Sequence, residues 1–219
     1  MKVNYKVVAT ILLLFASSLS ARASSLSPVG MTHSLPEEGK EYRKLAAPLA
    51  SQPKVVEFFS FYCGPCYQFV ENYPVAEAIN GFLPENEKVV KYHVSAMGSL
   101  GSELTEAWAI AMVMGKTHEL EKPLFEAVGN KRLNTITDIQ DVFAKFGIDT
   151  SAYEQACQST QVKDVIARQN DALGSFAVRG TPSFYINGKY QINNASITAT
   201  TPQSYVAHFA EVVQILLTQ

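Results

Sequence analysis

Two cysteines separated by two residues, Cys63-Gly64-Pro65-Cys66, follow an apolar run and open a segment with helical periodicity. The run, residues 55–61, consists mainly of β-branched and aromatic residues, which predicts a buried strand. A strand that leads into this pair constrains the fold, because the first thiol then faces the N-terminus of the helix. Backbone N–H groups and the helix dipole favour a thiolate there. The thiolate attacks or leaves in disulfide exchange, so the sequence predicts a redox site.

Two other interpretations of the cysteine pair are half of a zinc site and an inert structural disulfide. Zinc takes four ligands, and the sequence has no second Cys-x-x-Cys pair and no His-x-x-x-His run. With only three cysteines, the chain is also unlike a small domain held together by disulfides. We therefore favour a redox pair and expect neither a metal nor a cofactor, while the inert disulfide stays an open alternative.

Residues 1–23 have the pattern of a secretory signal peptide: a short basic start, an apolar run from Val7 to Leu19, and the small-x-small sequence Ala21-Arg22-Ala23. The apolar run is too short for a comfortable membrane span. We therefore expect an exported protein, in a compartment where disulfides can persist. Removal of residues 1–23 leaves 15 basic and 20 acidic residues, a net charge of 15 minus 20, or −5. This charge argues against nucleic acid or an anionic membrane as the main partner.

The expected elements follow one another as strand, helix, strand, a helical region, a long helix, a hairpin and a final helix. Asn187-Gly188 between two apolar runs predicts the hairpin turn, because both turn residues need a positive φ. This order predicts an α/β protein with a thioredoxin fold and an inserted helical domain. We assign residues 24–96 and 170–219 to the thioredoxin-like domain and residues 97–169 to the inserted helical domain.

Several short motifs, spread over most of the chain after the signal peptide, carry a family resemblance. They are Glu57-Phe58-Phe59-Ser60-Phe61-Tyr62-Cys63, Cys66-Tyr67-Gln68-Phe69, Lys91-Tyr92-His93-Val94, Leu104-Thr105-x-Ala107-Trp108 and Asn187-Gly188-Lys189-Tyr190-Gln191. From about Glu38 to its C-terminus the chain resembles the DsbA family of exported thiol:disulfide oxidoreductases of Gram-negative bacteria. The resemblance implies a periplasmic enzyme that donates its disulfide to newly exported polypeptides with cysteines. It also implies reoxidation by a DsbB-like, quinone-linked membrane partner, and we expect the protein to be a monomer.

The chain departs from this family at positions beside the redox pair. The family's usual dipeptide between the cysteines is Pro-His, and here it is Gly64-Pro65, which is typical of thioredoxin. The residue before the proline that is cis in the family is usually Val, and here it is Thr181. Because a histidine beside the thiolate would stabilise it, we expect Cys63 to be less acidic than in typical members. Gly64 and Pro65 are therefore predicted to tune the redox potential.

The resemblance assigns roles to the cysteines and to one proline. Cys63 is expected to be the exposed thiol that attacks and leaves, and Cys66 the shielded, resolving one. Pro182 is expected to follow a cis peptide bond and to face the pair, where it would present backbone to an extended substrate; without the resemblance, an ordinary trans proline is the usual case. Thr181 would then lie beside the disulfide and affect its potential or the release of substrate.

Glu57 is an acid inside an apolar strand, where an unpaired charge is unfavourable. It either lies at an edge in contact with water, or is a buried carboxyl with a raised pKa that helps to move the proton of Cys66, paired with Lys91 on the next strand. Both residues match family positions. His93 is interpreted as structural, and Cys157 as a buried free cysteine, with intermolecular pairing as the alternative.

The leading hypothesis is therefore a dithiol oxidase that introduces disulfides into exported proteins through Cys63 and Cys66. A reductase or isomerase on the same scaffold is the nearest alternative, because Gly64-Pro65 and Thr181 favour it. A non-catalytic peptide-binding protein with a structural cysteine pair is the alternative from another class.

Overall fold

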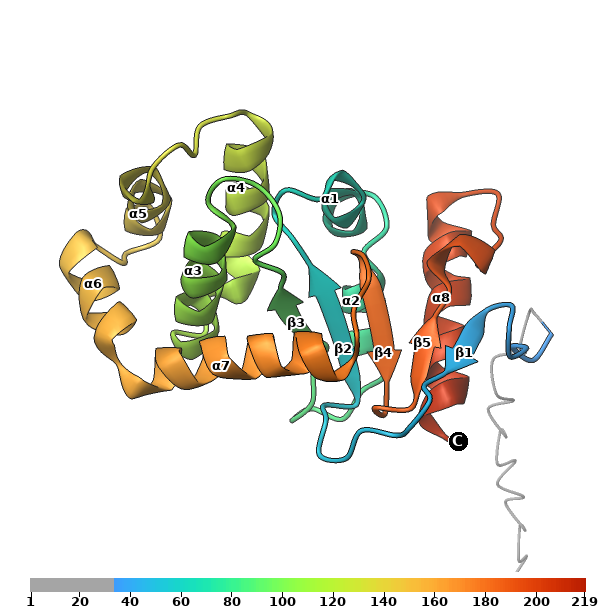
Figure 1. Cartoon of the computed structure of the whole chain (residues 1–219). Coiled ribbons are helices and arrows are strands. Elements are labelled where there is room, and N and C mark those ends of the chain that lie inside the picture. Colours follow the sequence, from blue (N-terminus) through green and yellow to red (C-terminus); the bar gives the residue numbers. More distant parts are fainter. Residues whose placement is uncertain (1–33) are drawn as a thin grey trace, which may run out of the picture. The chain divides into compact units, whose positions relative to one another are not determined.

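The computed structural model describes residues 34–219 of the 219-residue chain, so the predicted signal peptide lies outside the described residues. A five-stranded mixed sheet with the strand order β1-β5-β4-β2-β3 forms the centre of this part (Figure 1). The strands are β1 (Tyr42–Lys44), β2 (Val55–Phe59), β3 (Val90–His93), β4 (Ser183–Ile186) and β5 (Tyr190–Ile192). The four strands expected from the sequence are present as β2 to β5, and β2 is shorter than the apolar run 55–61 that predicted it.

The central strand β2 pairs in parallel with β3 and antiparallel with β4. The β4–β5 hairpin turns at Asn187 and Gly188, whose φ angles of 52° and 61° are both positive, as predicted. A Cβ atom on Gly188 would also lie 2.2 Å from the carbonyl oxygen of Leu49, so this turn position has no room for a side chain. The turn therefore sets the register of β4 against β5.

Nine helical segments connect and cover the described strands. They are α1 (Gly64–Glu71), α2 (Val75–Asn80), α3 (Gly101–Val113), α4 (Thr117–Gly129), α5 (Ile136–Ala144), α6 (Thr150–Gln158), α7 (Thr160–Ser175), the short 3₁₀ helix η1 (Asn194–Ser196) and α8 (Pro202–Leu217). The helix predicted after the cysteine pair is divided into α1 and α2 at residues 72–74. Pro74 lies at this break, since a proline cannot donate the helical hydrogen bond.

Alternate residues of β2 point to opposite faces of the sheet, and each face has its own hydrophobic core. Val55 packs with residues of α2 and α8 on one face, among them Ile79 and Phe209. Val56 and Phe58 pack on the other face against the C-terminal end of α7. Figure 1 shows α7 crossing in front of the sheet and α8 behind it. The sheet is thus covered on both sides, which explains why all five residues of β2 are buried.

The helices from α3 to α7 enclose a third core beyond the edge of the sheet. It includes Leu104, Trp108, Leu124, Phe143 and Tyr153, together with Phe59, Phe61 and both cysteines from the strand and loop next to it. Packing therefore joins the helical region directly to the redox pair. None of the helices in residues 34–219 is long and apolar enough to cross a membrane.

The predicted domain boundary at residues 169 and 170 falls inside the continuous helix α7. Val162 and Val165 at the start of α7 belong to the helical core, whereas Ala172 near its end packs on the sheet. One helix thus belongs to both cores, and the division into two domains stays a prediction.

Candidate active site

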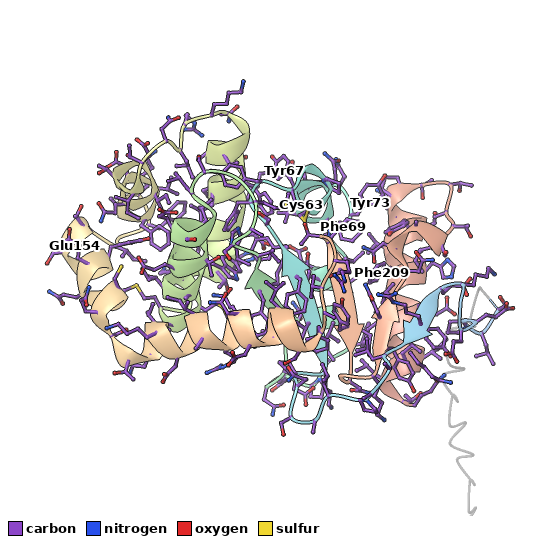
Figure 2. The ribbon with its side chains drawn as sticks, viewed as in Figure 1. Cys63, Tyr67, Phe69, Tyr73, Glu154 and Phe209 are labelled. Atoms are coloured by element: carbon purple, nitrogen blue, oxygen red, sulfur yellow. A yellow bond between two sulfur atoms is a disulfide. The ribbon has the colours of Figure 1, made fainter. Side chains whose placement is uncertain are left out.

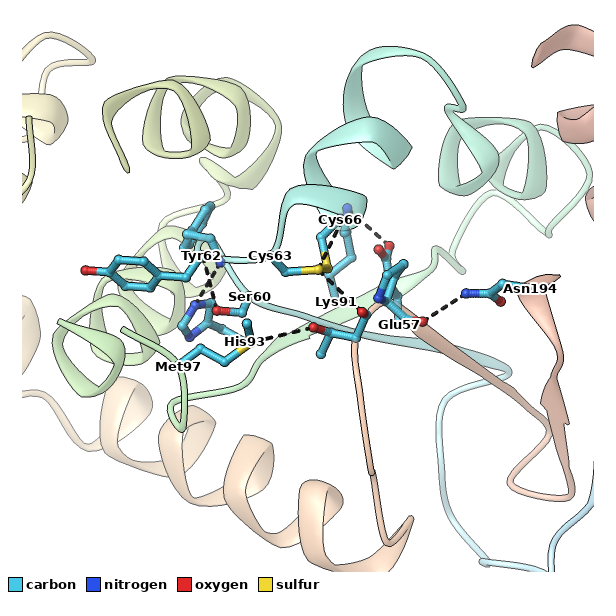
Figure 3. The surroundings of a disulfide bond; sticks show 12 residues. Glu57, Ser60, Tyr62, Cys63, Cys66, Lys91, His93, Met97 and Asn194 are labelled. Atoms are coloured by element: carbon cyan, nitrogen blue, oxygen red, sulfur yellow. Dashed lines mark hydrogen bonds and ion pairs between the residues drawn. A yellow bond between two sulfur atoms is a disulfide. The ribbon is translucent and has the colours of Figure 1, made fainter. Parts of the chain in front are cut away.

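Cys63 and Cys66 form a disulfide at the start of α1, with their Cα atoms 5.2 Å apart (Figures 2 and 3). Cys63 is the N-cap of α1, and its Sγ accepts a hydrogen bond from the backbone N–H of Cys66 at 3.2 Å. Pro65 lies in the first turn, where its missing N–H removes no helical hydrogen bond. When the disulfide is reduced, unpaired N–H groups and the helix dipole at this end favour a negative charge on the Cys63 sulfur.

The loop between α7 and β4 brings a backbone carbonyl to the disulfide. The Thr181–Pro182 peptide bond is cis, as predicted, and the carbonyl oxygen of Thr181 lies 3.4 Å from the Sγ of Cys63. The side-chain amide of Asn194 in η1 donates a hydrogen bond of 2.9 Å to the carbonyl oxygen of Pro182 (Figure 3). The hydroxyl of Thr181 lies 3.8 Å from the Sδ of Met97. These contacts hold the cis loop directly against the reactive sulfur.

Cys63 is more buried than the sequence predicted, because this loop lies against its sulfur. Its exposed fraction is 5%, and that of Cys66 is 0%. The expected order is kept: Cys63, at the helix cap, retains a little exposed surface, whereas Cys66 lies fully inside. The roles of Cys63 as the attacked sulfur and Cys66 as the resolving one stay predictions.

Glu57 and Lys91 lie opposite each other in the β2–β3 register, among the residues that surround the disulfide in Figure 3. The Oε2 of Glu57 is 3.1 Å from the Nζ of Lys91, and the Glu57 side chain is 1% exposed. Within the described residues, its carboxyl oxygens have no other partner. The interpretation of Glu57 as a solvated edge residue is therefore wrong. Its burial and its pairing with Lys91 are confirmed, and its role in moving the proton of Cys66 stays a prediction.

Burial raises the pKa of Glu57 to about 7, while the Lys91 ammonium acts in the opposite direction and the Glu121 carboxylate adds to the increase. Lys91 also forms an ion pair with Glu121 of α4. Burial by itself would lower the pKa of Lys91, but the two carboxylates outweigh burial and raise it. One positive charge is thus shared by two acids, and Glu57, with its raised pKa, is partly protonated at neutral pH.

His93 at the end of β3 supports the backbone that precedes the cysteines. Its Nε2 accepts a hydrogen bond of 3.2 Å from the N–H of Phe61, and its Nδ1 lies 2.8 Å from the hydroxyl of Thr105. That hydroxyl donates in turn to the carbonyl oxygen of Gly101 at 3.0 Å. Because the Thr105 hydroxyl donates to Gly101, it accepts a hydrogen bond from Nδ1 of His93, while Nε2 is itself an acceptor. His93 is therefore neutral, with its proton on Nδ1. Burial agrees with this, because it lowers the pKa of His93 to about 3.

We expect His93 to make the folded state sensitive to acid. Its folded pKa of about 3 lies below the ordinary value of 6.5, so the unfolded state binds more protons between these values and stability falls as the pH drops from 6.5 towards 3. The full loss from this group is on the order of 5 kcal/mol. His93→Gln, which keeps a polar side chain that does not titrate, should flatten this part of the stability profile. Urea unfolding at a series of pH values measures it.

The matched control for His93→Gln is the same change at His118, which is exposed on α4. It should leave the slope between pH 3 and 6.5 as in the wild type. Glu57 acts in the opposite direction between its ordinary pKa of 4.5 and about 7, where stability falls as the pH rises. This contribution is present in every variant and cancels from the comparison. Equal slopes in wild type and His93→Gln would contradict the role assigned to His93.

Cys157 is a free, partly buried cysteine in α6, away from the redox pair. Its Sγ donates a hydrogen bond of 3.1 Å to a carboxylate oxygen of Glu106. Burial and this carboxylate raise the pKa of Cys157 to about 12, which keeps the thiol protonated. A thiol of this kind is a poor nucleophile, so Cys157 does not compete with Cys63 in disulfide exchange.

The structure thus brings together all eight candidate site residues, Glu57, Cys63, Gly64, Pro65, Cys66, Lys91, Thr181 and Pro182, around one disulfide and the strands beneath it. Sequence reasoning missed Glu121, because its contact with Lys91 depends on how α4 packs beside β3. The interpretation of His93 as structural is confirmed, because its side chain holds the backbone of Phe61 in front of the cysteines.

The chain is similar to known proteins over most of its length. Residues 54–204 match the family described as DSBA-like thioredoxin domain. The chain is 42% identical over 183 residues to a thiol:disulfide interchange protein DsbA of Yersinia pestis, with 83% of this chain and 88% of the relative covered. Its structure is similar to that of a DsbA disulfide interchange protein from Klebsiella pneumoniae, with a TM-score of 0.82, 43% identity and coverage of 85% of this chain and 100% of the other.

A second solved structure, a Proteus mirabilis DsbA variant in complex with a non-covalently bound peptide, has a TM-score of 0.81 and 36% identity, and the match covers 85% of this chain and 100% of the other. The match to the family, the identity to relatives and the shared fold all include the segment with the cysteine pair. The chain therefore belongs to the family of DSBA-like thioredoxin domains.

Proposed function

We propose that this protein is a thiol:disulfide oxidoreductase that introduces disulfides into exported polypeptides by exchange through Cys63 and Cys66. The observation that carries the proposal is the position of the disulfide: it lies at a helix N-terminus, and the backbone carbonyl oxygen of Thr181 lies 3.4 Å from the Sγ of Cys63. An inert structural disulfide needs neither feature. The name of the relatives, thiol:disulfide interchange protein, agrees with this chemistry.

In the proposed reaction, a substrate thiolate attacks the Sγ of Cys63. A bond forms between the substrate sulfur and Cys63, the Cys63–Cys66 bond breaks, and Cys66 leaves as a thiolate that takes up a proton. A second substrate thiolate then attacks the substrate sulfur of the mixed disulfide and expels Cys63 as a thiolate. The substrate loses two electrons and gains a disulfide, and the protein gains the two electrons as a dithiol.

The neighbouring residues take part in this reaction as follows. Gly64 and Pro65 set the stability of the Cys63 thiolate, because neither has a side chain that can compensate its charge. Glu57, held by Lys91, exchanges a proton with the fully buried Cys66. The backbone at Thr181 and Pro182 pairs with an extended substrate, which then lies against Cys63. Each role is a proposal that a substitution can test.

The substrates that fit this site are unfolded or folding exported polypeptides with cysteines. We place the protein in the periplasm, on the basis of the signal-peptide pattern of residues 1–23 and the family resemblance. A DsbB-like membrane quinone reductase would return the dithiol to the disulfide. Deletion of residues 1–23 should keep the protein out of the periplasmic fraction, and cell fractionation measures this.

The direct test mixes the oxidised protein with a reduced, unfolded polypeptide that has two cysteines. We expect one disulfide to form in the polypeptide for each protein molecule that becomes a dithiol, and mass spectrometry after alkylation counts both. The control is the same protein reduced beforehand, which should transfer none. Loss of substrate thiols without gain of thiols on Cys63 and Cys66 would refute the proposal.

A reductase or isomerase on the same scaffold is the second candidate, because the dipeptide Gly64-Pro65 is the one typical of thioredoxin. A reductase needs a lower potential than an oxidase, since its dithiol must be the stronger electron donor. The equilibrium of the Cys63–Cys66 disulfide with glutathione therefore separates the two directions.

A further inference from the structure

The ion pair beneath the redox site has a third member, Glu121, which lies on α4 in the helical region. We propose that Glu121 is a positioning residue for disulfide exchange: it shares the Lys91 ammonium with Glu57 and so keeps Glu57 in its neutral, proton-carrying form. This inference rests on the proposed function, because it concerns the proton that Cys66 takes up when the disulfide opens. Glu121 lies outside the two strands that carry Glu57 and Lys91.

The geometry makes Lys91 the bridge between the two acids. Its Nζ lies 3.1 Å from the Oε2 of Glu57 and is also hydrogen-bonded to the Oε1 of Glu121. The exposed fractions of the side chains rise outward, from 1% for Glu57 to 13% for Lys91 and 16% for Glu121. The three groups therefore form a row from a buried acid towards solvent, and Glu57 and Lys91 lie in the surroundings of the disulfide (Figure 3).

The charge of this cluster decides which acid holds a proton. With both acids ionised, the cluster has one positive and two negative charges, an unpaired negative charge in a largely buried place, which is unfavourable. One proton on a carboxyl makes the cluster neutral. Glu57 takes it, because it is the more buried acid and has no other partner among the described residues, whereas Glu121 has more contact with water.

The outer end of the cluster opens into a cavity of about 450 Å³ between α2, β3 and α4, lined in part by Lys91 and Glu121. The other titratable groups of its lining are Glu77 of α2, Lys88 before β3 and His118 of α4, all exposed. From the opposite side the cluster faces α1 and the disulfide, where Cys66 is the group that titrates after reduction. In the described part of the chain, the ion pairs of Lys91 are those with Glu57 and Glu121.

A neutral Glu57 favours the opening of the disulfide. When Cys66 leaves as a thiolate, a protonated carboxyl nearby can give up its proton to the sulfur, whereas an ionised one would repel the new negative charge. Without Glu121, Lys91 would pair with Glu57 alone and favour its ionised form. The opening of the disulfide should then be slower at neutral pH.

The test replaces Glu121 with glutamine, which keeps the size of the side chain and removes its charge. The titration of Glu57 is followed in the oxidised protein by NMR of ¹³C-labelled glutamate carboxyls, and Glu57→Gln assigns the signal. We expect the midpoint to move down by about one pH unit or more in Glu121→Gln. The rate constant for reduction of the disulfide by glutathione is measured over a range of pH and divided by the fraction of glutathione that is thiolate. The pH at which this corrected rate constant falls should decrease by the same amount.

The matched control is Glu77→Gln, which removes the same charge from the same cavity at an acid outside the ion pairs of Lys91. It should leave the midpoint and the profile unchanged, and thermal unfolding of both variants checks that they are folded. An unchanged midpoint in Glu121→Gln, or an equal shift in both variants, would refute the inference. If the wild type showed no exchange with thiols at all, the proposed function would fail, and the carboxyl titration would still decide the role of Glu121.

Discussion

Replacement of Cys63 with serine is expected to reduce disulfide transfer to the uncatalysed rate, the largest effect that one substitution in this chain can have. A serine hydroxyl forms no disulfide, so neither the first attack nor the departure of the thiolate can take place. Oxidation of a reduced polypeptide by the oxidised protein, followed by counting of thiols, measures the loss. The fold should survive, because Cys63 lies at a helix cap, where serine is itself a favourable residue.

Cys66→Ala should have a different effect from Cys63→Ser, because it leaves the attacking thiol in place. The Cys63 thiolate of this variant should attack oxidised glutathione or a substrate disulfide, release one thiol and form a mixed disulfide. The variant should keep this mixed disulfide, since the resolving thiol is absent. Mass spectrometry of the intact protein detects the added mass. Cys157→Ser is the matched control and should leave transfer unchanged, because the raised pKa of Cys157 keeps that thiol unreactive.

The same variants separate an enzyme from a peptide-binding protein. If Cys63→Ser left the cellular role of the protein intact, the cysteine pair would be structural and the non-catalytic alternative would hold. Trapping of the mixed disulfide in Cys66→Ala but not in Cys63→Ser would support the order of attack proposed here.

The second large effect concerns the redox potential, which we expect to lie between the two reference values of about −270 mV for thioredoxin and about −120 mV for DsbA. Most of this chain resembles the DsbA family, whereas the dipeptide between its cysteines, Gly64-Pro65, is the one typical of thioredoxin. The gap of about 150 mV corresponds to roughly five decades of equilibrium constant, or about 7 kcal/mol. Equilibration with glutathione buffers measures the potential, and a value at or above that of DsbA would contradict the expectation.

The double variant Gly64→Pro and Pro65→His should raise the potential towards the upper value. A histidine in the first turn of α1 places a polar and partly cationic ring near the Cys63 sulfur, which stabilises the thiolate and hence the reduced form. The site can accept the change, because a Cβ on Gly64 would have no atom within 4 Å, and a proline at the first helical position is favourable. Gly64→Pro with Pro65→Gln is the control, because it changes size without adding a charge. An equal rise in both variants would mean that charge is not the cause.

The direction of the reaction in the cell follows from this measurement. A potential near the upper value would support an oxidase, and one near the lower value a reductase or isomerase. Thr181 would then be the next residue to examine, because its carbonyl lies against the Cys63 sulfur.

Local sequence patterns predicted most elements of this fold. The apolar run before Cys63 became β2, and Asn187-Gly188 became the hairpin turn with both φ angles positive. These features depend on residues next to each other in the chain, so the sequence contains them directly. Strand ends were overestimated, because an apolar run continues into the loop that carries Phe61 to the helical core.

The pairing of Glu57 with Lys91 was within reach of sequence reasoning for a similar reason. Two neighbouring parallel strands align their residues in register, and a lone acid in one and a lysine in the other are each costly to bury unpaired. The contact of Lys91 with a second acid, Glu121, could not be predicted in this way. Glu121 comes from a helix 30 residues further on, and its position depends on how α4 packs beside the sheet.

The amino-acid sequence by itself determined the redox chemistry of this protein, because Cys63 and Cys66 are three residues apart and the helix that follows supplies the N–H groups around the first sulfur. It also determined the fold class, through the order of strands and helices. Only the tertiary structure decided what surrounds the disulfide: the Thr181 carbonyl 118 residues away, the neutral His93 and the shared ammonium of Lys91. The physical reason is that these contacts arise when separate elements pack together and bury their polar groups. The pKa values of the buried groups therefore follow from packing that no local pattern contains.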